Sequence, residues 1–313
     1  MMTTLAAGVD VGRDHLDVAL APSGLAFRVP NRPDGIAAIL TRLERNGVRK
    51  VVLESIGSYG ARLVRSLADA GFETGIVDPR RIKALRLAEG GRAKTDRLDA
   101  ALIARFALTM EHAARPVPSA RTFQIRALSS RRRQLVELAA IEKTRLRQAF
   151  DTDIADSCRR MIAILSEERL QIERKLAALL AEQPDHDRRS ALLRTIPGIG
   201  PAIAMTLLAD LPEIGTLDRR AVASLAGVAP HPNQSGTRTG AAHIQGGRPC
   251  VRVALYFAAL SATRSDKGFK AEYRAMRENG KPAKVALIAI ARKLVVAANG
   301  MLKENHPWQS KTA

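Results

Sequence analysis

The first part of the chain alternates short apolar runs with stretches whose apolar residues recur at helical spacing. Three short apolar runs come first, separated by Gly12-Arg13-Asp14 and Pro22-Ser23-Gly24, and such turn-rich breaks are typical of an antiparallel meander. Helices and further strands then alternate up to residue 108, which predicts an α/β domain. The expected elements are strands 5–11, 16–21, 25–29, 51–53 and 72–77 and helices 35–46, 61–70 and 95–108.

The middle of the chain contains no proline between Pro118 and Pro184, and its apolar residues keep a heptad-like spacing. Leu128 and Leu135 are seven residues apart, and the run from Met161 to Leu179 continues the pattern. This spacing predicts two long helices that form an antiparallel coiled coil or a dimerisation arm. The chain is expected to reverse near Asp151-Thr152-Asp153.

Residues 191–303 predict a second, mainly helical domain. It opens with Pro197-Gly198-Ile199-Gly200-Pro201, followed by the apolar stretch 202–211. A Pro-Gly-Ile-Gly turn before a helix is typical of a helix-hairpin-helix, in which glycines let backbone N–H groups approach a phosphate. Gly198 and Gly200 are therefore candidate nucleic-acid contacts, although an ordinary glycine-rich connection between helices would have the same sequence.

Together these patterns predict an α/β plus α protein. We expect an α/β domain over 1–112, a helical linker or coiled coil over 113–188, a mostly α-helical C-terminal domain over 189–305 and a tail over 306–313.

The composition excludes some classes of protein. No apolar run reaches the ~18 residues of a membrane span, and the start has no secretory signal pattern. Cys158 and Cys250 are too few and too far apart for a disulfide framework or a zinc site, which agrees with a reducing cytoplasm. We therefore expect a cytoplasmic, nucleoid-associated protein without a membrane partner.

The charge points to a polyanionic partner. The net charge is +19, and residues 191–313 carry 17 basic against 7 acidic residues. A surplus of this size favours nucleic acid, bound partly through release of counterions.

Four acidic residues of the first domain are candidate metal ligands. Asp10 lies inside one predicted strand, Glu54 ends another, and Asp96 and Asp99 share a helix face at a spacing of three residues. The order of strands and helices is that of an RNase H fold, whose sheet would bring these acids together, and several hard oxygen ligands are what a two-metal phosphodiester site needs. Separately, each acid could be a strand-end or helix-capping residue. Lys94 is a further candidate nucleic-acid contact.

A second chemical cluster lies between two helices of the C-terminal domain, in what we expect to be a glycine-rich basic loop. Arg238, Arg248 and Arg252 are candidate phosphate contacts there. Ser235, followed by Gly236, could be a nucleophile, but a serine hydroxyl needs a base or a metal to activate it, and the loop offers no obvious base. A Ser-Gly pair is also common in ordinary turns.

Taken together, these motifs resemble those of DEDD-type insertion-sequence transposases related to the pilin-gene invertases, a group described as bridge-RNA-guided serine recombinases. The resemblance spans nearly the whole chain in order. The segments that carry it are 8–11, 54–59, 93–100, 197–201, 226–230, 233–236, 246–248, 252–256, 280–284 and 292–294.

The resemblance implies a RuvC-like catalytic domain that binds Mg²⁺ through Asp10, Glu54, Asp96 and Asp99. It also implies that Ser235 reaches this metal from the C-terminal domain and forms a covalent phosphoserine with DNA. Homo-tetramers built from dimers, donor and target double-stranded DNA, and a structured guide RNA are its further implications.

Three hypotheses follow from the sequence. The first is a transposase that forms a Ser235–DNA adduct, and the second is a RuvC-like nuclease that uses water at the same four acids. The third is a nucleic-acid-binding protein without enzymatic activity.

Overall fold

The computed structural model divides the chain into two compact units, Met1–Phe123 and Gln124–Ala313. The boundary lies inside a long helix. Most of the predicted helical linker, residues 124–188, belongs to the second unit, and one end of it is part of that unit's core. The residues that the structure describes are 5–54, 59–90, 95–109, 119–183, 185–235 and 238–309.

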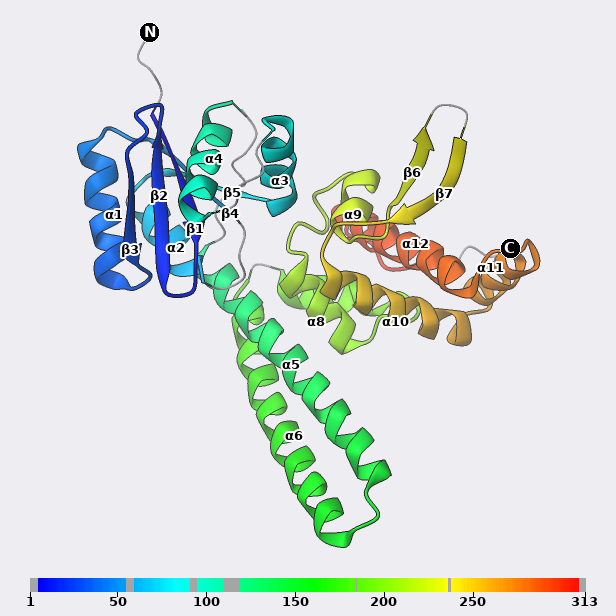
Figure 1. Ribbon diagram of the computed structural model, residues 1–313. Coiled ribbons are helices and arrows are strands. Elements are labelled where there is room, and N and C mark those ends of the chain that lie inside the picture. Colours follow the sequence, from blue (N-terminus) through cyan, green and yellow to red (C-terminus); the bar gives the residue numbers. More distant parts are fainter. Residues whose placement is uncertain are drawn as a thin grey trace. The chain divides into compact units, whose positions relative to one another are not determined.

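The first unit is built on a five-stranded mixed sheet with the order β3-β2-β1-β4-β5 (Figure 1). The first three strands form the predicted antiparallel meander, and the last two run parallel to β1. The predicted strands and their order are confirmed. The strands are β1 (Ala6–Val11), β2 (His15–Ala21), β3 (Ala26–Pro30), β4 (Lys50–Glu54) and β5 (Glu73–Val77).

Four helices accompany this sheet, of which the sequence patterns predicted three. The missed helix directly follows β5, where Asp78 caps it by accepting a hydrogen bond from the Arg80 N–H at 2.8 Å. Proline in the first turn after such a cap is a helix start signal, which the sequence analysis did not use. The helices are α1 (Pro33–Arg45), α2 (Ala61–Asp69), α3 (Pro79–Ala88) and α4 (Asp96–Thr109).

Helix α4 lies unusually close to the centre of the sheet because small residues line the contact. A Cβ atom on Gly8 of β1 would lie 2.2 Å from the Ala104 nitrogen and 2.4 Å from the Ala100 oxygen. The buried residues Ala19, Ala21, Ala100 and Ala104 form a small-residue cluster between the helix and the sheet. Only glycine at position 8 therefore allows this approach, which brings the start of α4 beside β1.

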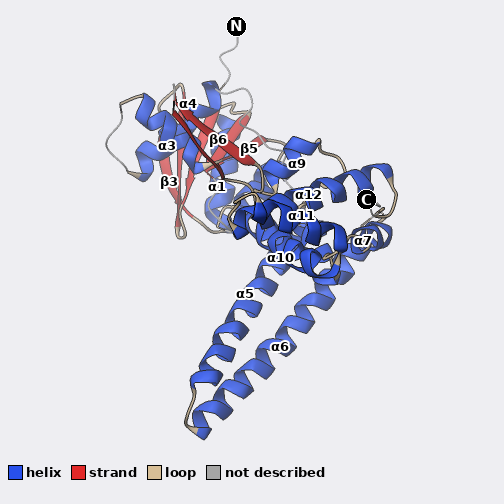
Figure 2. Ribbon diagram, turned by 90° about the vertical axis from the view of Figure 1, so that its right-hand side faces the viewer, coloured by secondary structure: helices blue, strands red, loops and turns tan. Residues whose placement is uncertain are grey.

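The second unit begins with the two predicted long helices, α5 (Ala120–Gln148) and α6 (Thr152–Ala181), which pair as a hairpin (Figure 2). Asp151 caps α6 by accepting hydrogen bonds from the Asp153 and Ile154 N–H groups, so the reversal lies where it was expected. Large apolar side chains stay exposed along the hairpin: Val136, Leu138, Ile141, Phe150, Ile154, Met161, Ile164 and Leu170.

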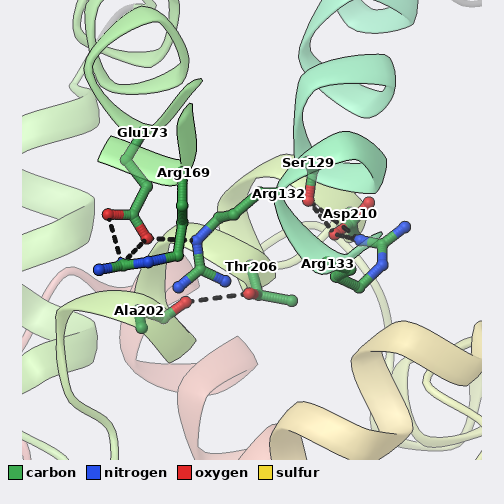
Figure 3. Close-up of polar contacts among 8 residues, drawn as sticks. All are labelled: Ser129, Arg132, Arg133, Arg169, Glu173, Ala202, Thr206 and Asp210. Carbon is green, nitrogen blue, oxygen red and sulfur yellow. Dashed lines mark hydrogen bonds and ion pairs between the residues drawn. The ribbon is translucent and has the colours of Figure 1, made fainter. Parts of the chain in front are cut away.

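Polar contacts attach the hairpin to the core of the second unit (Figure 3). The buried carboxylate of Asp210 accepts hydrogen bonds from Ser129 Oγ at 2.6 Å and from Arg133 at 2.7 Å. Between the two long helices, Glu173 accepts hydrogen bonds from Arg132 of α5 and Arg169 of α6. These contacts fix the base of the hairpin, whereas its far end extends away from the core.

The rest of the second unit is helical apart from one β-hairpin. Its core joins the base of the long helices, through Ile125, Leu176 and Leu180, to the C-terminal helices. Among the described residues, α12 is the one helix long and apolar enough to cross a membrane, but half of that stretch is buried in this core. The elements are α7 (His186–Arg194), α8 (Pro201–Asp210), α9 (Arg219–Leu225), β6 (Pro230–Ser235), β7 (Arg238–Ile244), α10 (Pro249–Ser265), α11 (Lys267–Glu278) and α12 (Ala283–Glu304).

Candidate metal centre and nucleic-acid contacts

Four charged residues form a row across the sheet of the first unit. Asp10 on β1 pairs in register with Asp17 on β2, and Asp17 pairs with Arg28 on β3. On the other side of β1, Val9 pairs with Leu53, so Glu54 of β4 comes beside Asp10. In-register neighbours on adjacent strands project from the same face of a sheet. The carboxylates of Asp17, Asp10 and Glu54 thus lie side by side. They are on the face of the sheet that packs against α4 at Gly8.

The ionisation of Asp10 reports how close the acids are. Burial, and then the negative charges of Glu54, Asp99, Asp96 and Asp17, raise the pKa of Asp10 from 3.8 to about 6. The other three predicted acids therefore lie close enough to act on Asp10 within the first unit. Asp17 joins them although the sequence analysis did not name it, and together we call these five residues the acidic cluster.

Two arginines compensate part of this charge. Arg28 donates to both carboxylate oxygens of Asp17, at 2.9–3.1 Å, and one of its nitrogens also donates to Asp96 at 2.9 Å. Arg86 of α3 donates to Asp99, whose side chain is 7% exposed. Asp96 and Asp99 share the first turn of α4 as predicted, but Asp96 is bound by Arg28 and Asp99 by Arg86.

The acidic cluster has the donor chemistry of a divalent-metal site but not its closed geometry. In this arrangement, no three histidine, cysteine, aspartate or glutamate residues of the described chain converge closely enough to hold an ion. Hard carboxylate oxygens are nonetheless the ligands that Mg²⁺ prefers, and burial together with the neighbouring carboxylates raises the pKa of Asp10.

Ser235 lies in a β-hairpin, not in the predicted loop. It is the last residue of β6 and pairs in register with Arg238, the first residue of β7. The prolines of Pro230-His231-Pro232 hid this strand from sequence patterns, because proline cannot donate to a sheet. The side chains of Ser235 and Arg238, like the whole of Lys94, lie outside the described part of the chain, so the roles predicted for these three residues stay predictions.

The other two arginines of this region make contacts within the second unit. Arg248 forms a bidentate ion pair with Glu213, with both distances 2.6 Å, and also donates to the Asp210 carbonyl. Arg252 donates to the Gly246 and Gly227 carbonyl oxygens. Both guanidinium groups thus hold the segment after β7 against the ends of α8 and α9, and the phosphate contacts expected of them stay predictions.

The Pro-Gly-Ile-Gly turn connects α7 to α8 as predicted, and one of its glycines has a packing role. Gly198 has a φ of +82°, and a Cβ there would lie 2.2 Å from the Ala258 oxygen of α10. Its backbone therefore packs directly on α10. Gly200 caps α8, and a Cβ there would meet nothing within 4 Å. Of the two candidate phosphate contacts, Gly200 is the one on an open surface.

Comparison with known families decides to which protein family the chain belongs. Residues 7–152 match a domain described as a DEDD-type transposase, and residues 190–274 match one described as transposase IS116/IS110/IS902 family. The chain belongs to the IS110 family of transposases. The predicted resemblance to this family is confirmed, and the DEDD class of its first domain implies dependence on a divalent metal.

Individual relatives of this IS110-family transposase agree with the assignment. The pilin gene-inverting protein of Moraxella bovis is 28% identical over 83% of this chain and 82% of its own length. An insertion element IS110 protein of 43.6 kDa from Streptomyces coelicolor is 24% identical, with 97% of this chain and 95% of the relative covered. Among solved structures, T. thermophilus RuvC bound to a Holliday junction is 19% identical over 36% of this chain and 83% of its own, with a TM-score of 0.25. The strand order, not this likeness, supports the RNase H topology.

The sequence analysis missed three residues that contact or adjoin the acidic cluster. Asp17 carried the same signal as Asp10, a lone charge in an apolar strand, and could have been found. Arg28 and Arg86 had no such signal, because arginines are frequent throughout the chain and Arg86 lies on a helix that was not predicted.

Proposed function

We propose that this transposase cleaves and rejoins DNA strands through a phosphoserine at Ser235, with a Mg²⁺ site in the acidic cluster. The observation that carries the proposal is the placement of Asp10, Asp17 and Glu54 side by side on one face of the sheet, next to the helix that bears Asp96 and Asp99. A protein that only binds nucleic acid has no use for such a concentration of negative charge, because it repels phosphates.

The metal would be held by Asp10, Glu54, Asp96 and Asp99. A bound divalent cation supplies charge stabilisation at a phosphoryl oxygen and acidifies a coordinated hydroxyl or water. The protein's own part is to hold these carboxylates on two strands and one helix. Asp17 and Arg28 stand next to the ligand set and orient Asp96.

The proposed chemistry conserves the energy of the phosphodiester bond. The Ser235 hydroxyl loses its proton and its oxygen forms a bond to phosphorus, while the bond between phosphorus and one DNA oxygen breaks and that oxygen takes up a proton. A DNA hydroxyl of a new partner strand then attacks the phosphoserine and releases Ser235. Bond making and breaking balance, so no nucleotide triphosphate is needed.

The proposal includes the partners that the family resemblance implies. Donor and target double-stranded DNA and a structured guide RNA would bind to a protein of net charge +19. Pairing with the RNA would select the sequence, while the protein contacts backbone and shape. The exposed apolar side chains of the α5–α6 hairpin support self-association, which we propose leads to dimers and then tetramers. Relatives named as gene-inverting proteins make inversion one candidate outcome of the reaction.

The decisive experiment separates serine from water as the nucleophile. The protein is incubated with Mg²⁺, copurified RNA and radiolabelled DNA, and protein–DNA adducts are detected on a denaturing gel. We expect an adduct and exchanged strands for the wild type and for Ser261→Ala, a serine on α10 used as a matched control. Ser235→Ala should lose both products while still binding DNA.

The alternative function is a RuvC-like nuclease that uses water. If Ser235→Ala still cleaved DNA hydrolytically, without an adduct, that alternative would replace our proposal. If Asp10→Ala left all activity unchanged, neither enzyme would stand and the chain would be a nucleic-acid-binding protein.

A further inference from the structure

A groove with an aliphatic floor lies in the second unit, on elements that do not carry the acidic cluster. It has a volume of about 810 Å³ and is lined by the start of α9, the base of the β6–β7 hairpin and one face of α12. These elements are labelled in Figure 1. Val228, Val285, Ile288 and Val296 contribute the floor, of which the last three share a face of α12. Val285 is 52% exposed, so an apolar surface is open to solvent here.

The rim of this groove is strongly basic. All six cations that line it are exposed, and they come from α9, from the turn before α12 and from α12 itself. Of these six cations, only Lys293 forms an ion pair with a described residue, Glu272 at 2.7 Å. The nearby carboxylate of Asp218 accepts hydrogen bonds from backbone N–H groups at the start of α9. A surplus of cations is thus left for a ligand. The six are Arg219, Arg220, Lys281, Lys284, Arg292 and Lys293. We call this feature the basic groove.

The combination of a cationic rim and an apolar floor selects among polyanions. A duplex presents phosphates on its outside and keeps its base faces stacked within, so it would use the rim and leave the floor uncovered. An unpaired strand exposes sugars and base faces together with its phosphates, and these can cover aliphatic side chains. The volume lies within the ~300–1,000 Å³ of typical ligand pockets, which suits a short piece of single strand.

We propose that the basic groove binds an unpaired strand of nucleic acid, with phosphates at the rim and sugars and bases on the aliphatic floor. The described residues that line the groove include one histidine, His243, but no phenylalanine, tyrosine or tryptophan, so binding should depend little on base identity. The inference rests on the proposed function, since unpaired strands arise both in strand exchange and in a structured guide RNA. Beyond the proposed function, the basic groove is the place on the protein where such a strand would be held.

The test measures fluorescence anisotropy of labelled oligonucleotides with the full-length protein over a series of salt concentrations. The ligands are single-stranded DNA and single-stranded RNA of mixed sequence, and duplex DNA. For the variant Lys284→Gln with Arg292→Gln, the slope of log K against log salt for single strands should fall in magnitude by about 1.4. This value follows from roughly 0.7 for each phosphate that the variant no longer neutralises.

Two further variants separate the groove from general charge effects. The double change Arg264→Gln with Lys270→Gln removes two exposed cations from α10 and α11 outside the groove, and should leave the slope close to that of the wild type. Val285→Asn changes the floor without changing charge. It should weaken single-strand binding about threefold to fivefold at an unchanged salt slope, and leave duplex binding as it was.

The outcomes distinguish this inference from the function on which it rests. Equal binding of single strands by the groove variant and the control variant would overturn the basic groove, as would an equal or larger loss of duplex binding. A larger loss for RNA than for DNA, or the reverse, supports the groove and identifies the source of the strand. Asp10→Ala should keep single-strand binding and lose strand exchange, so the groove would stand even if the chemistry proposed for Ser235 failed.

Discussion

Asp10 and Asp17 are direct cross-strand partners on β1 and β2, so two carboxylates project from the same face at the same level of the sheet. Like charges that face each other in this way destabilise a sheet, and burial adds to the effect on Asp10. Asp17 avoids the penalty by its bidentate bond with Arg28, whereas burial and the neighbouring carboxylates raise the pKa of Asp10. This asymmetry is the reason that we propose Asp10 as the centre of a cation site.

The first prediction concerns the pH dependence of stability without metal. Because the pKa of Asp10 rises from 3.8 to about 6 on folding, the native state binds its proton more tightly than the unfolded state does. That contribution to stability is fully present below pH 3.8 and is lost as the pH rises through about 6. In a chelating buffer, the melting temperature of Asp10→Asn should fall less than that of the wild type over this window.

Added Mg²⁺ should act in the opposite direction, because it pairs with the ionised cluster. Its stabilising effect on the wild type should grow between pH 4 and pH 7 in the same thermal melts. Parallel curves for wild type and Asp10→Asn, with and without Mg²⁺, would contradict a cation site centred on Asp10.

The second prediction concerns Arg28. Arg28→Gln removes the guanidinium from Asp17, whose side chain is only 11% exposed, and releases Asp96. An unsatisfied charged group of this kind should lower the free energy of unfolding of the first unit by about 1–3 kcal/mol. Activity should require a different Mg²⁺ concentration, because Asp96 is no longer held in place.

A matched control is Arg32→Gln, which breaks a pair with Asp34 in which both side chains are more than 60% exposed. That change should alter the free energy of unfolding far less than Arg28→Gln does, because solvent screens an exposed ion pair. Equal effects of the two arginine substitutions in chemical denaturation would show that Arg28 has no special place beside the cluster.

The third prediction concerns the contact between α4 and the sheet. In Gly8→Ala the new Cβ would collide with the backbone of α4 at Ala100 and Ala104, so the helix must move. Overpacking of this kind should destabilise the first unit by about 1–3 kcal/mol. A displacement of ~1 Å of Asp96 and Asp99 should also lower activity about a hundredfold.

Gly60→Ala serves as the control in the same unit, since a Cβ there makes only ordinary contacts, 3.6 Å from Val11. It should keep both stability and strand exchange close to wild type. If Gly8→Ala behaved like Gly60→Ala in both assays, the close approach of α4 would not determine the position of the acids.

The fourth prediction concerns the base of the long helical hairpin. Asp210→Ala removes the acceptor for Ser129 and Arg133 (Figure 3), and Ser129 is 3% exposed. The second unit should lose about 1–3 kcal/mol of stability. Trp308, the sole tryptophan, stacks on Phe269 in this unit, so its fluorescence during urea denaturation reports the change.

For comparison, Asp156→Ala breaks an exposed pair with Arg159 on α6 and should shift the urea midpoint by less than the equivalent of ~1 kcal/mol. Identical midpoints for the two aspartate variants would mean that Asp210 does not anchor the hairpin.

Local patterns in the sequence were enough for most of the secondary structure. The apolar runs predicted the five strands and their order, and the heptad-like spacing predicted the two long helices with their reversal near Asp151. They failed for α3, where Asp78-Pro79 was not recognised as a helix start, and for β6, where two prolines in Pro230–Ser235 disguised a strand. In both cases proline has two meanings that only the neighbouring chain distinguishes.

By itself, the amino-acid sequence determined the family, the α/β order of the first unit and four of the five members of the acidic cluster. These depend on periodicity and on residue types along one segment at a time. Only the tertiary structure decided that Asp17 joins Asp10 and that Arg28 and Arg86 bind the acids of α4. Only the tertiary structure, too, showed that Arg248 pairs with Glu213 and that Arg252 donates to backbone carbonyl oxygens. Such pairings depend on the register of strands and on how closely helices pack, which arise from contacts between segments far apart in the chain.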